Sequence, residues 1–316
     1  MLPQRALGSS GIDVSVLALG SWRTYDHISR AQGVAVMTAA REAGITFLDD
    51  ARYNDETGRA PIPTGYSEVV FGELFRTSGW PRDDAIVANK LWWEFWPGET
   101  AEQELDASLE RMGFDYVDLI YACWPPEGLE AEEIVTAVAW LIAAGKARAW
   151  GVCNWPPQLL SEAVEFARAE GLPAPCAAQL PYNLVHRESV EGDEDAAALE
   201  AAGVSVVASA SLMSGALSGK YASPDATGRI ADKLDEPFVK EALEASRPLT
   251  ELADRLDATP AALALAFALA GPRVAAVLFG ATTPEQIREN VKAVEVLASL
   301  DDDTLEGLRA IGRAVH

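Results

Sequence analysis

Short apolar runs alternate with amphipathic, alanine-rich stretches along almost the whole chain. The apolar runs are too short for helices and are bounded by turn residues, so they predict strands. The amphipathic stretches repeat apolar residues at helical spacing and predict helices between the strands. Strands are expected near 15–20, 45–49, 84–89, 115–121, 147–152, 175–180, 204–208 and 275–279, and helices near 31–43, 66–77, 101–112, 131–144, 157–170, 194–202, 260–270 and 284–297.

This alternation predicts an α/β fold with parallel strands joined by right-handed crossovers. Eight strand–helix pairs are also the number that closes a (β/α)8 TIM barrel. A doubly wound open sheet is the competing architecture, but its Gly-x-Gly-x-x-Gly turn is missing after the first strand, where the sequence is Leu17-Ala-Leu-Gly-Ser-Trp22. The sequence therefore predicts a TIM barrel organised as one domain over residues 1–316.

Several segments fall outside the repeat. Residues 5–14 turn at Gly8-Ser-Ser-Gly11 and predict an N-terminal hairpin that closes the bottom of the barrel. Residues 54–65 form a long loop after the second strand, and extra helices are expected near 237–256 and, at the C-terminus, near 301–313. Long insertions after barrel strands line the mouth of the barrel, where function is carried.

The composition is that of a globular protein, with 49% hydrophobic and 23% charged residues among 316. The 48 acidic residues outnumber the 25 basic ones and leave a net charge of −23, which repels nucleic acid and anionic membranes. Three cysteines suit neither a disulfide framework nor a zinc site, and no apolar run is long enough to span a membrane. We therefore expect a cytoplasmic protein without a metal and without nucleic-acid or membrane partners.

Polar residues that are unusual for a core end or follow the predicted strands. Because the carboxyl ends of all barrel strands open onto one mouth, their side chains are expected to meet there. These residues are Asp49, Asp50, Lys90, Cys123, Asn154, Gln179 and Ser209, with Gly280 after the last strand.

Lys90 interrupts an apolar strand and needs a counter-ion, since an unpaired buried ammonium is costly. Asp49 ends the neighbouring strand and is the natural partner. Tyr53 follows closely, and the pair is expected to lower the pKa of its phenol from about 10 toward 7, which takes roughly 4 kcal/mol. Such a phenol donates a proton to a carbonyl while another group delivers hydride. A plain buried ion pair beside a loop tyrosine explains the same residues equally well.

Seven segments in a fixed order carry a resemblance to a known family. They are residues 5–22, Phe47-Leu-Asp-Asp-Ala-Arg-Tyr53, Val87-Ala-Asn-Lys90, Gly151-Val-Cys-Asn-Trp155, Ala178-Gln-Leu-Pro-Tyr-Asn-Leu184, residues 212–221 and residues 280–290. Over nearly its full length the chain resembles the aldo-keto reductase superfamily, and most closely the branch of bacterial reductases and potassium-channel β subunits. The resemblance implies a barrel that binds NADP(H) extended across its mouth.

The resemblance also implies roles for single residues. Asp49, Tyr53 and Lys90 match three members of the family's catalytic tetrad, and Cys123 stands where the family has its catalytic histidine. The implied cofactor-binding residues are Ser21, Trp22, Asp49, Asn154, Gln179, Ser209, Leu212, Ser214, Lys220, Arg229, Gly280, Thr282, Gln286, Glu289 and Asn290. Local explanations compete for three of them, because Gln286 suits a helix cap, Lys220 a solvated loop and Asn154 the start of a helix.

The sequence departs from the family in three places. Cys123 is a weak hydrogen-bond donor, so it polarises a substrate carbonyl less than a histidine does. Tyr53 is one residue closer to Asp49 than in the family, which leaves Tyr66 as a rival proton donor. Ser209 replaces the aromatic residue that stacks on nicotinamide.

Tryptophans follow several strand ends and predict a bulky or aromatic small-molecule substrate, unless they only pack loops onto the barrel rim. They are Trp22, Trp92, Trp93, Trp96, Trp124 and Trp155. The sequence therefore predicts an NADPH-dependent oxidoreductase that reduces a carbonyl or a conjugated double bond, with Tyr53 as proton donor. An NADP(H)-binding redox sensor or regulatory barrel with negligible turnover is the alternative.

Overall fold

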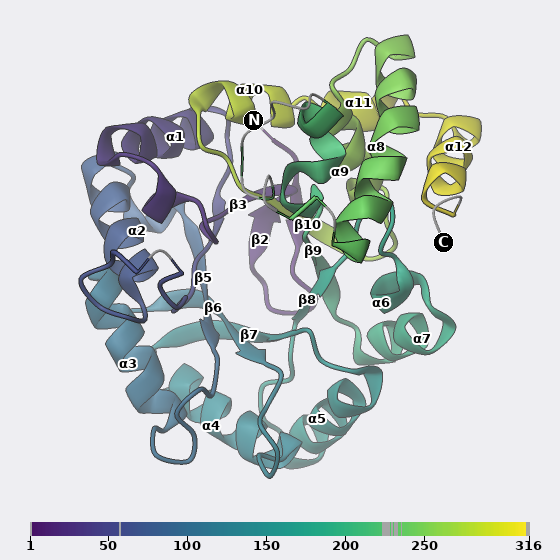
Figure 1. The fold of residues 1–316 in the computed structure, drawn as a ribbon. Helices are drawn as coiled ribbons and strands as arrows, with labels where there is room; N and C mark the ends of the chain where they lie inside the picture. Colours follow the sequence, from purple (N-terminus) through teal and green to yellow (C-terminus); the bar gives the residue numbers. More distant parts are fainter. Residues whose placement is uncertain are drawn as a thin grey trace.

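The strands of the chain close into a barrel surrounded by helices (Figure 1). The computed structural model describes residues 2–56, 58–222, 228, 230, 233–234 and 236–313. Around the barrel the strands follow the order β10-β3-β4-β5-β6-β7-β8-β9, and every neighbouring pair is parallel. The predicted (β/α)8 barrel is confirmed.

The barrel strands lie within two residues of their expected boundaries. They are β3 (Leu17–Gly20), β4 (Phe47–Asp49), β5 (Ile86–Leu91), β6 (Val117–Cys123), β7 (Ala147–Cys153), β8 (Ala177–Pro181), β9 (Ser205–Ser209) and β10 (Val274–Phe279). The difference matters at β5 and β6, because Lys90 and Cys123 belong to the strands and not to the loops after them. Strand hydrogen bonds therefore set the direction of both side chains.

Helices begin and end close to the local signals in the sequence. They are α1 (Arg30–Glu42), α2 (Tyr66–Thr77), α3 (Ala101–Met112), α4 (Ala131–Ala143), α5 (Pro157–Glu170), α6 (Glu188–Glu191), α7 (Asp193–Ala202), α8 (Pro237–Arg255), α9 (Pro260–Leu269), α10 (Pro284–Asn290), α11 (Ala293–Ser299) and α12 (Asp302–Arg313), with short 3-10 helices η1 (Tyr25–His27), η2 (Arg82–Asp84), η3 (Met213–Ser218) and η4 (Lys220–Ala222). Thr100 and Gln103 form a reciprocal capping box at the start of α3. The extra helices predicted near 237–256 and 301–313 are α8 and α12.

The single helix expected over 284–297 is wrong, because two helices cover this range. The chain turns between α10 and α11, where the Lys292 N–H bonds to the Glu289 carbonyl at 3.2 Å. This bond reaches back three residues where an α-helix reaches back four, so the turn tightens and the helix ends.

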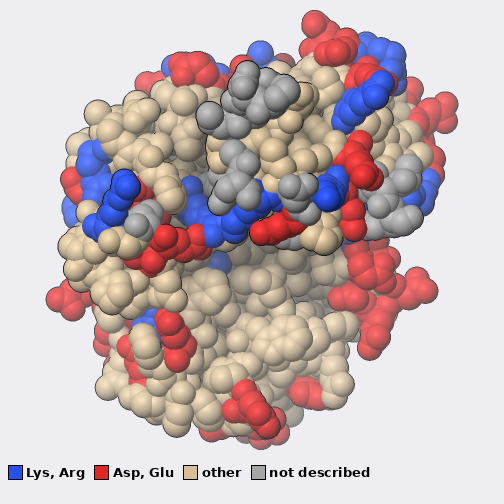
Figure 2. Space-filling view, viewed as in Figure 1, with Lys and Arg blue, Asp and Glu red and all other residues tan. Residues whose placement is uncertain are grey.

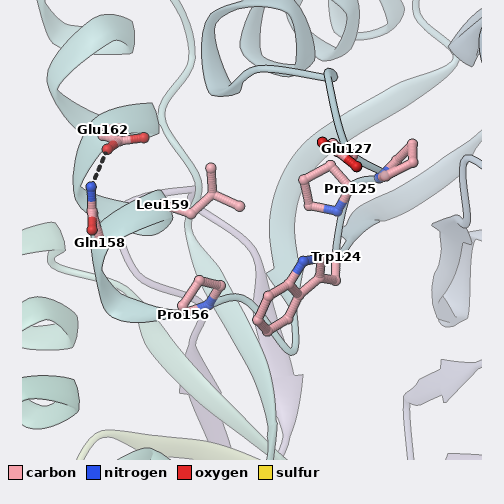
Figure 3. Close-up of a pocket in the computed structure, with 8 residues that line it drawn as sticks. Trp124, Pro125, Glu127, Pro156, Gln158, Leu159 and Glu162 are labelled. Carbon is pink, nitrogen blue, oxygen red and sulfur yellow. Dashed lines mark hydrogen bonds between the residues drawn. The ribbon is translucent and has the colours of Figure 1, made fainter.

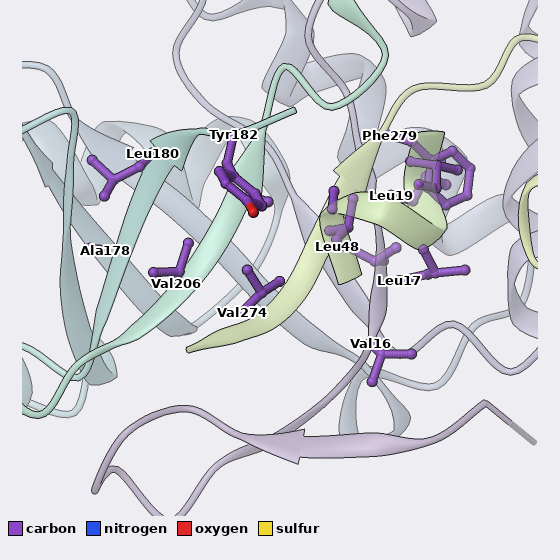
Figure 4. Packing of buried hydrophobic residues seen from close by; sticks show 14 of the residues in the cluster. Val16, Leu17, Leu19, Leu48, Ala178, Leu180, Tyr182, Val206, Val274 and Phe279 are labelled. Atoms are coloured by element: carbon purple, nitrogen blue, oxygen red, sulfur yellow. The ribbon is translucent and has the colours of Figure 1, made fainter. Parts of the chain in front are cut away.

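The N-terminal hairpin closes the end of the barrel at which β3 begins, as Figure 4 shows near Val16. Strands β1 (Gln4–Ala6) and β2 (Asp13–Ser15) pair antiparallel, and Leu7 and Val14 pack among the side chains of the barrel interior. The Arg5 guanidinium donates to the Val274 carbonyl at 2.5 Å and ties the hairpin to β10. The hairpin does not cover the opposite end of the barrel, at which the strands finish and the predicted site residues lie.

Side chains alternate between the barrel interior and the layer beneath the helices, part of which Figure 4 shows. Along β6, Tyr121 and Cys123 face the interior, whereas Ala122 packs toward the helices. Cys123 is the register partner of Cys153 on β7, and Cys153 is the register partner of Gln179 on β8. The side chains of Cys123, Cys153 and Gln179 therefore lie in one layer of the barrel interior, near the carboxyl ends of the strands.

Two kinds of feature are absent from the described residues. No helix in these ranges has the length and apolar character that a membrane span requires. Within the same ranges, no three His, Cys, Asp or Glu side chains are grouped in a way that suits a metal ion.

Candidate active site

A buried ion pair lies at the carboxyl end of the barrel strands. Asp49 ends β4, Lys90 is the penultimate residue of β5, and each is 3% exposed. Lys90 Nζ lies 2.5 Å from Asp49 Oδ1, and Gln179 Nε2 donates to Asp49 Oδ2 at 2.9 Å. Each carboxylate oxygen thus has a partner, as a buried charge requires. The expected pairing of Asp49 with Lys90 is present, and Gln179 joins it from across the barrel.

Tyr53 reaches this pair from the loop after β4. Its ring centroid lies 5.9 Å from Lys90 Nζ, and the ring packs edge-on against Trp92 with the centroids 6.1 Å apart. The Tyr53 N–H donates to the Ala51 carbonyl, and the Gly65 N–H donates to the Tyr53 carbonyl, both at 2.9 Å. These bonds hold the loop in a conformation that keeps the partly buried phenol beside the buried cation.

Tyr66 has a different partner. It is the first residue of α2, its hydroxyl accepts a hydrogen bond from the Arg30 guanidinium at 2.9 Å, and its ring centroid lies 5.7 Å from that group. Arg30 in turn forms an ion pair with Glu73 of α2 at 2.9 Å. The Tyr66 phenol therefore bridges α1 and α2 and is engaged away from Lys90.

The pKa of the Tyr53 phenol is raised above its ordinary value. Burial is the main cause; the Lys90 ammonium lowers the pKa, while the Asp49 and Asp50 carboxyls add to the rise. The expectation that the ion pair lowers the pKa of the Tyr53 phenol is therefore wrong for the protein alone. The Asp49 carboxyl offsets the effect of Lys90 on this pKa, and burial outweighs the part of the Lys90 effect that is left. Tyr53 keeps its proton at neutral pH, which suits a proton donor.

Lys90 itself stays charged. Burial lowers its pKa, but the Asp49 carboxylate together with the smaller effects of Tyr53 and Cys153 outweighs burial and raises the pKa well above its ordinary value. The site therefore contains a permanent buried cation next to a protonated phenol.

A second buried ion cluster anchors the loops on both sides of Tyr53. Arg52 directly precedes Tyr53, and its guanidinium lies 3.1 Å from the Glu104 carboxylate of α3. Glu104 also accepts the backbone N–H groups of Trp92 and Trp93 at 2.7 and 3.2 Å. The loop that carries Tyr53 and the loop that carries its packing partner Trp92 are thus fixed by one carboxylate. This cluster is not predicted from the sequence, where its only signal is an acidic residue, Glu104, on the buried side of an amphipathic helix.

Asp50 is a buried acid behind the ion pair. It is fully buried, and its Oδ1 accepts a hydrogen bond from Ser21 Oγ, whereas its Oδ2 has no partner among the described residues. Burial and the Glu68 carboxylate raise the pKa of Asp50 well above its ordinary value, against the effects of Ser21 and Lys90. The folded protein therefore favours the protonated form of Asp50 more than water does. Ser21, predicted as a cofactor residue, uses its hydroxyl to hold this acid.

Cys123 ends β6 with its thiol in the barrel interior. Its carbonyl oxygen accepts the indole N–H groups of Trp93 at 3.2 Å and Trp155 at 2.9 Å. Both tryptophans are buried and support the strand end, so the prediction that they line a substrate site is wrong for these two.

Asn154 follows β7 and Ser209 ends β9, and β8 lies between these two strands. Asn154 is exposed, has a left-handed backbone with φ of 58°, and donates its N–H to the Gln179 carbonyl at 3.0 Å. It does not cap the next helix, since Pro156 is the N-cap residue of α5. Ser209 ends β9 and is partly buried.

A second phenol lies as close to the cation as Tyr53 does. The ring centroid of Tyr121 on β6 is 5.8 Å from Lys90 Nζ, and its buried hydroxyl has no partner among the described residues. Gly151 on β7 makes room for it, because a Cβ there would lie 3.1 Å from Tyr121 Cδ1. Tyr121 is not among the residues predicted from the sequence, although its two-residue spacing from Cys123 along one strand indicates the same face.

The predicted residues after β9 lie in the 3-10 segments. Leu212 precedes η3, and Ser214 within η3 has a left-handed backbone with φ of 54° and ψ of 26°. Lys220 is exposed, its Nζ lies 4.8 Å from the Tyr221 ring centroid, and no carboxylate of the described ranges pairs with it. Arg229 lies outside the described residues.

The predicted residues after β10 lie directly before α10 or within it. They are Gly280, Thr282, Gln286 and Glu289, which are exposed or partly exposed, and Asn290, which is buried. Gln286 Oε1 accepts the Thr282 N–H at 2.7 Å, and the Gln286 N–H donates to Thr283 Oγ1 at 3.3 Å. Gln286 thus acts as a helix cap, as the local explanation expects. Because β10 lies between β9 and β3, this segment shares the mouth with Asp49.

Exposed aromatic side chains stand around the mouth. Trp22 is 44% exposed and Trp124 is 60% exposed, and Phe95, which the sequence analysis missed, is 50% exposed. A pocket of about 420 Å³ lies between the loops after β6 and β7, where Trp124, Pro156 and Leu159 face one another (Figure 3). Trp124 directly follows Cys123, so this pocket adjoins the strand end that carries the thiol.

Charge is unevenly distributed on the face shown in Figure 2. Lys and Arg side chains form a band across the middle of this face, beside several Asp and Glu side chains, and the surface is hollowed below the band. A protein with a net charge of −23 thus still offers local cations on this face.

The sequence of the chain matches that of a known protein family. Residues 16–313 match the Aldo/keto reductase family. The chain belongs to this family. Membership in the Aldo/keto reductase family supports an oxidoreductase and agrees with the closed barrel and the buried Asp49–Lys90 pair.

Three relatives within the family carry the names of channel subunits. The chain is 32% identical over 96% of its length to a "Probable voltage-gated potassium channel subunit beta" of Oryza sativa subsp. japonica, of which it covers 95%. It is 33% identical over 98% of its length to a "Putative voltage-gated potassium channel subunit beta" of Schizosaccharomyces pombe, of which it covers 93%. It is 30% identical over 96% of its length to a "Probable voltage-gated potassium channel subunit beta" of Arabidopsis thaliana, of which it covers 95%.

Proposed function

We propose that this chain is an NADPH-dependent oxidoreductase that reduces a carbonyl or a conjugated double bond of a bulky or aromatic substrate, with Tyr53 as proton donor. The observation that carries the proposal is the buried Lys90 ammonium, held 2.5 Å from Asp49, with the Tyr53 ring centroid 5.9 Å from it. In an Aldo/keto reductase barrel these groups lie at the end where the strands finish.

The residues at the mouth fit an anionic dinucleotide. Lys220 offers an exposed ammonium that no carboxylate of the described ranges neutralises. Gly215 lies beside this ammonium, since a Cβ there would be 3.9 Å from Lys220 Nζ, so its missing side chain leaves room for a bound group. Asn154 presents an exposed amide beside Gln179, which matches the donor and acceptor pattern of a carboxamide. These residues would hold NADPH, with Asn154 and Gln179 at its nicotinamide end and Lys220 at its pyrophosphate.

The chemistry divides between the cofactor and the protein. When bound, NADPH supplies the hydride. Tyr53 carries the proton, because burial keeps its phenol protonated at neutral pH. As Tyr53 gives up this proton, negative charge develops on its oxygen, and the nearby Lys90 cation stabilises that charge. Asp49 keeps Lys90 charged and in place. The ion pair thus acts on the phenolate that forms during the reaction.

Cys123 and the aromatic rim bear on the substrate. Cys123 occupies the position of the family's histidine in this proposal, and its thiol contributes little polarisation of the substrate carbonyl. Trp22, Phe95 and Trp124 offer large exposed apolar surfaces, and the pocket beside Trp124 has a volume of about 420 Å³. These features favour a bulky or aromatic substrate over a small polar one.

The proposal is tested by NADPH binding and turnover in the same preparation. NADPH fluorescence titration measures binding, and loss of the nicotinamide absorbance with aromatic aldehydes measures reduction. We expect saturable binding and turnover in the wild type. Tyr53→Phe is expected to lower kcat by about 10²–10⁴-fold while the NADPH Kd stays within about two-fold.

Tyr66→Phe is the matched control, because it removes a phenol engaged by Arg30. Its kcat is expected to equal that of the wild type. Activity that survives Tyr53→Phe and disappears in Tyr121→Phe would transfer the donor role to Tyr121. NADPH binding without turnover of any aldehyde or enone would favour the regulatory alternative.

A further inference from the structure

Two cysteine side chains meet inside the mouth of the barrel. Cys123 and Cys153 are the last residues of the adjacent strands β6 and β7, they are register partners, and both face the interior. Paired residues of adjacent strands lie about 4.8 Å apart, which falls within the roughly 4.4–6.8 Å between Cα atoms that a disulfide spans. Both thiols are free.

Hydrogen bonds connect this thiol pair to the ion pair. Cys153, the register partner of Cys123, donates its thiol to Gln179 Oε1 at 3.7 Å. Gln179 donates in turn to Asp49, the partner of Lys90. The dithiol is therefore joined to the group of residues on which the proposed chemistry depends.

The surroundings make the two sulfurs chemically unequal. The hydrogen bond from Cys123 lowers the pKa of Cys153, burial opposes this, and the Lys90 ammonium lowers the pKa further. Burial and the same hydrogen bond raise the pKa of Cys123 well above its ordinary value. Cys153 is thus the more readily ionised thiol of the pair, which suits an attacking cysteine with Cys123 as the resolving one.

Both thiols are buried, but each lies at the end of its strand. Cys123 and Cys153 are each 4% exposed, whereas the residues that directly follow them, Trp124 and Asn154, are exposed. A small oxidant such as a hydroperoxide would reach the sulfurs from this end of the barrel. Cys176, the third cysteine, directly precedes β8 and lies at the other end of the barrel. Burial raises the pKa of its thiol to about 12.

We propose that Cys123 and Cys153 form a redox-active dithiol that hydroperoxides convert into an intramolecular disulfide. The Cys153 thiolate attacks the outer oxygen of the hydroperoxide, the O–O bond breaks, and the leaving alkoxide or hydroxide takes up a proton. Sulfur is oxidised to sulfenic acid and the peroxide is reduced. The Cys123 sulfur then attacks the sulfenic sulfur; the S–S bond forms, the S–O bond breaks, and the hydroxide leaves as water with the Cys123 proton.

The disulfide changes the site that the proposed reductase uses, and this consequence alone rests on the proposed function. It removes the Cys153 thiol from its contact with Gln179 and ties the ends of β6 and β7 together. A shift of the nicotinamide end of the site is expected to lower the reductase kcat/KM about ten-fold or more. Dithiothreitol is expected to restore it.

The test measures the covalent state, so it does not depend on activity. The full chain is treated with hydrogen peroxide, denatured in N-ethylmaleimide and analysed by intact mass and peptide mapping. We expect the wild type to lose two hydrogen atoms and two of its three alkylatable thiols, with a peptide that links Cys123 to Cys153. Cys176→Ser is the matched control and is expected to form the same link.

Two variants separate the roles of the sulfurs. Cys153→Ser is expected to slow oxidation of Cys123 about ten-fold or more, because the remaining thiol has the raised pKa. Cys123→Ser is expected to stop at a sulfenic acid on Cys153, which dimedone traps. Cys→Ala versions of both variants, checked by circular dichroism, replace any variant that fails to fold.

Three outcomes would overturn the proposal: no Cys123–Cys153 peptide in the treated wild type, a link that involves Cys176, or equal oxidation rates in the wild type and Cys153→Ser. A linked peptide with no reductase activity before or after dithiothreitol would leave the dithiol standing and refute only the proposed function.

Discussion

Replacing Lys90 by methionine removes the cation around which the site is built. Methionine keeps most of the volume of the side chain, so the change is chiefly one of charge. The Asp49 carboxylate then stays buried with Gln179 as its remaining partner. The reverse change, Asp49→Asn, leaves the buried ammonium without its counter-ion.

The size of the effect follows from the burial and geometry of the pair. Lys90 and Asp49 are each 3% exposed and their charged atoms lie 2.5 Å apart. Breaking a buried pair of this kind from one side costs about 3–5 kcal/mol, because the abandoned charge cannot return to water. The double variant Asp49→Asn/Lys90→Met abandons no charge, so it is expected to cost about 2–3 kcal/mol less than the sum of the single variants.

Urea unfolding followed by circular dichroism measures these differences, and thermal unfolding checks them. At roughly 2 °C per kcal/mol for a chain of this size, each single variant is expected to lower Tm by about 5–10 °C. Lys146→Met is the matched control. Lys146 lies 2.6 Å from Asp106, but the pair is partly exposed, so its loss is expected to cost about 1 kcal/mol or less.

The pH dependence of the stability difference tests the same reasoning. The folded-state pKa of Lys90 is raised above its ordinary value of 10.5, so the contribution of the pair is fully present below that value and is lost only as pH rises through the folded pKa. The difference between wild type and Lys90→Met is therefore expected to be flat from about pH 7 to 9. Single variants that cost as little as the Lys146 control, with strictly additive effects, would refute the buried interacting pair.

Three further predictions follow from the structure. Cys123→His is expected to raise kcat/KM for aromatic aldehydes about ten-fold or more by adding a strong donor, and an unchanged or lower value would show that the missing imidazole does not limit the rate. Asp50→Asn is expected to stabilise the protein at neutral pH. Because the pKa of Asp50 is raised in the folded state, the folded state binds the extra proton, and wild-type stability falls by about 1.4 kcal/mol per pH unit between the unfolded and folded pKa values. Urea unfolding at a series of pH values should therefore show the advantage of the variant vanishing below about pH 4. Gly72→Ala is expected to destabilise the protein by about 1–3 kcal/mol, because its Cβ would lie 2.0 Å from the Met112 carbonyl oxygen. Gly307→Ala on α12 is the control: its Cβ meets nothing within 4 Å, so it should stabilise the protein by up to about 1 kcal/mol. Equal effects of the two variants on Tm would contradict this contrast.

Local signals in the sequence were sufficient for most of the helices, though not for the division into α10 and α11, and less so for the strands. The expected ranges 66–77, 101–112 and 157–170 coincide with α2, α3 and α5, because caps such as Thr100 and helical periodicity act over a few neighbouring residues. The strands shifted by up to two residues, because a strand ends where its neighbour stops offering hydrogen-bond partners. That neighbour is distant in the sequence.

The candidate site shows the same division. Asp49, Lys90 and Gln179 were identified as strand-end residues, and they do meet. The sequence did not reveal Tyr121, since an aromatic residue in an apolar strand indicates only core until its neighbours are known. It also gave the wrong direction for the pKa of Tyr53, because desolvation depends on everything that surrounds the phenol.

The order of apolar and polar positions by itself determined the barrel, its plugging hairpin and the end at which polar side chains gather, because periodicity and strand count are properties of the chain. Only the tertiary structure decided which side chains touch. The register of β6 against β7 pairs Cys123 with Cys153, and burial raises the pKa of Asp50 and of Tyr53. Register and burial depend on contacts between residues far apart in the chain, so no local pattern contains them.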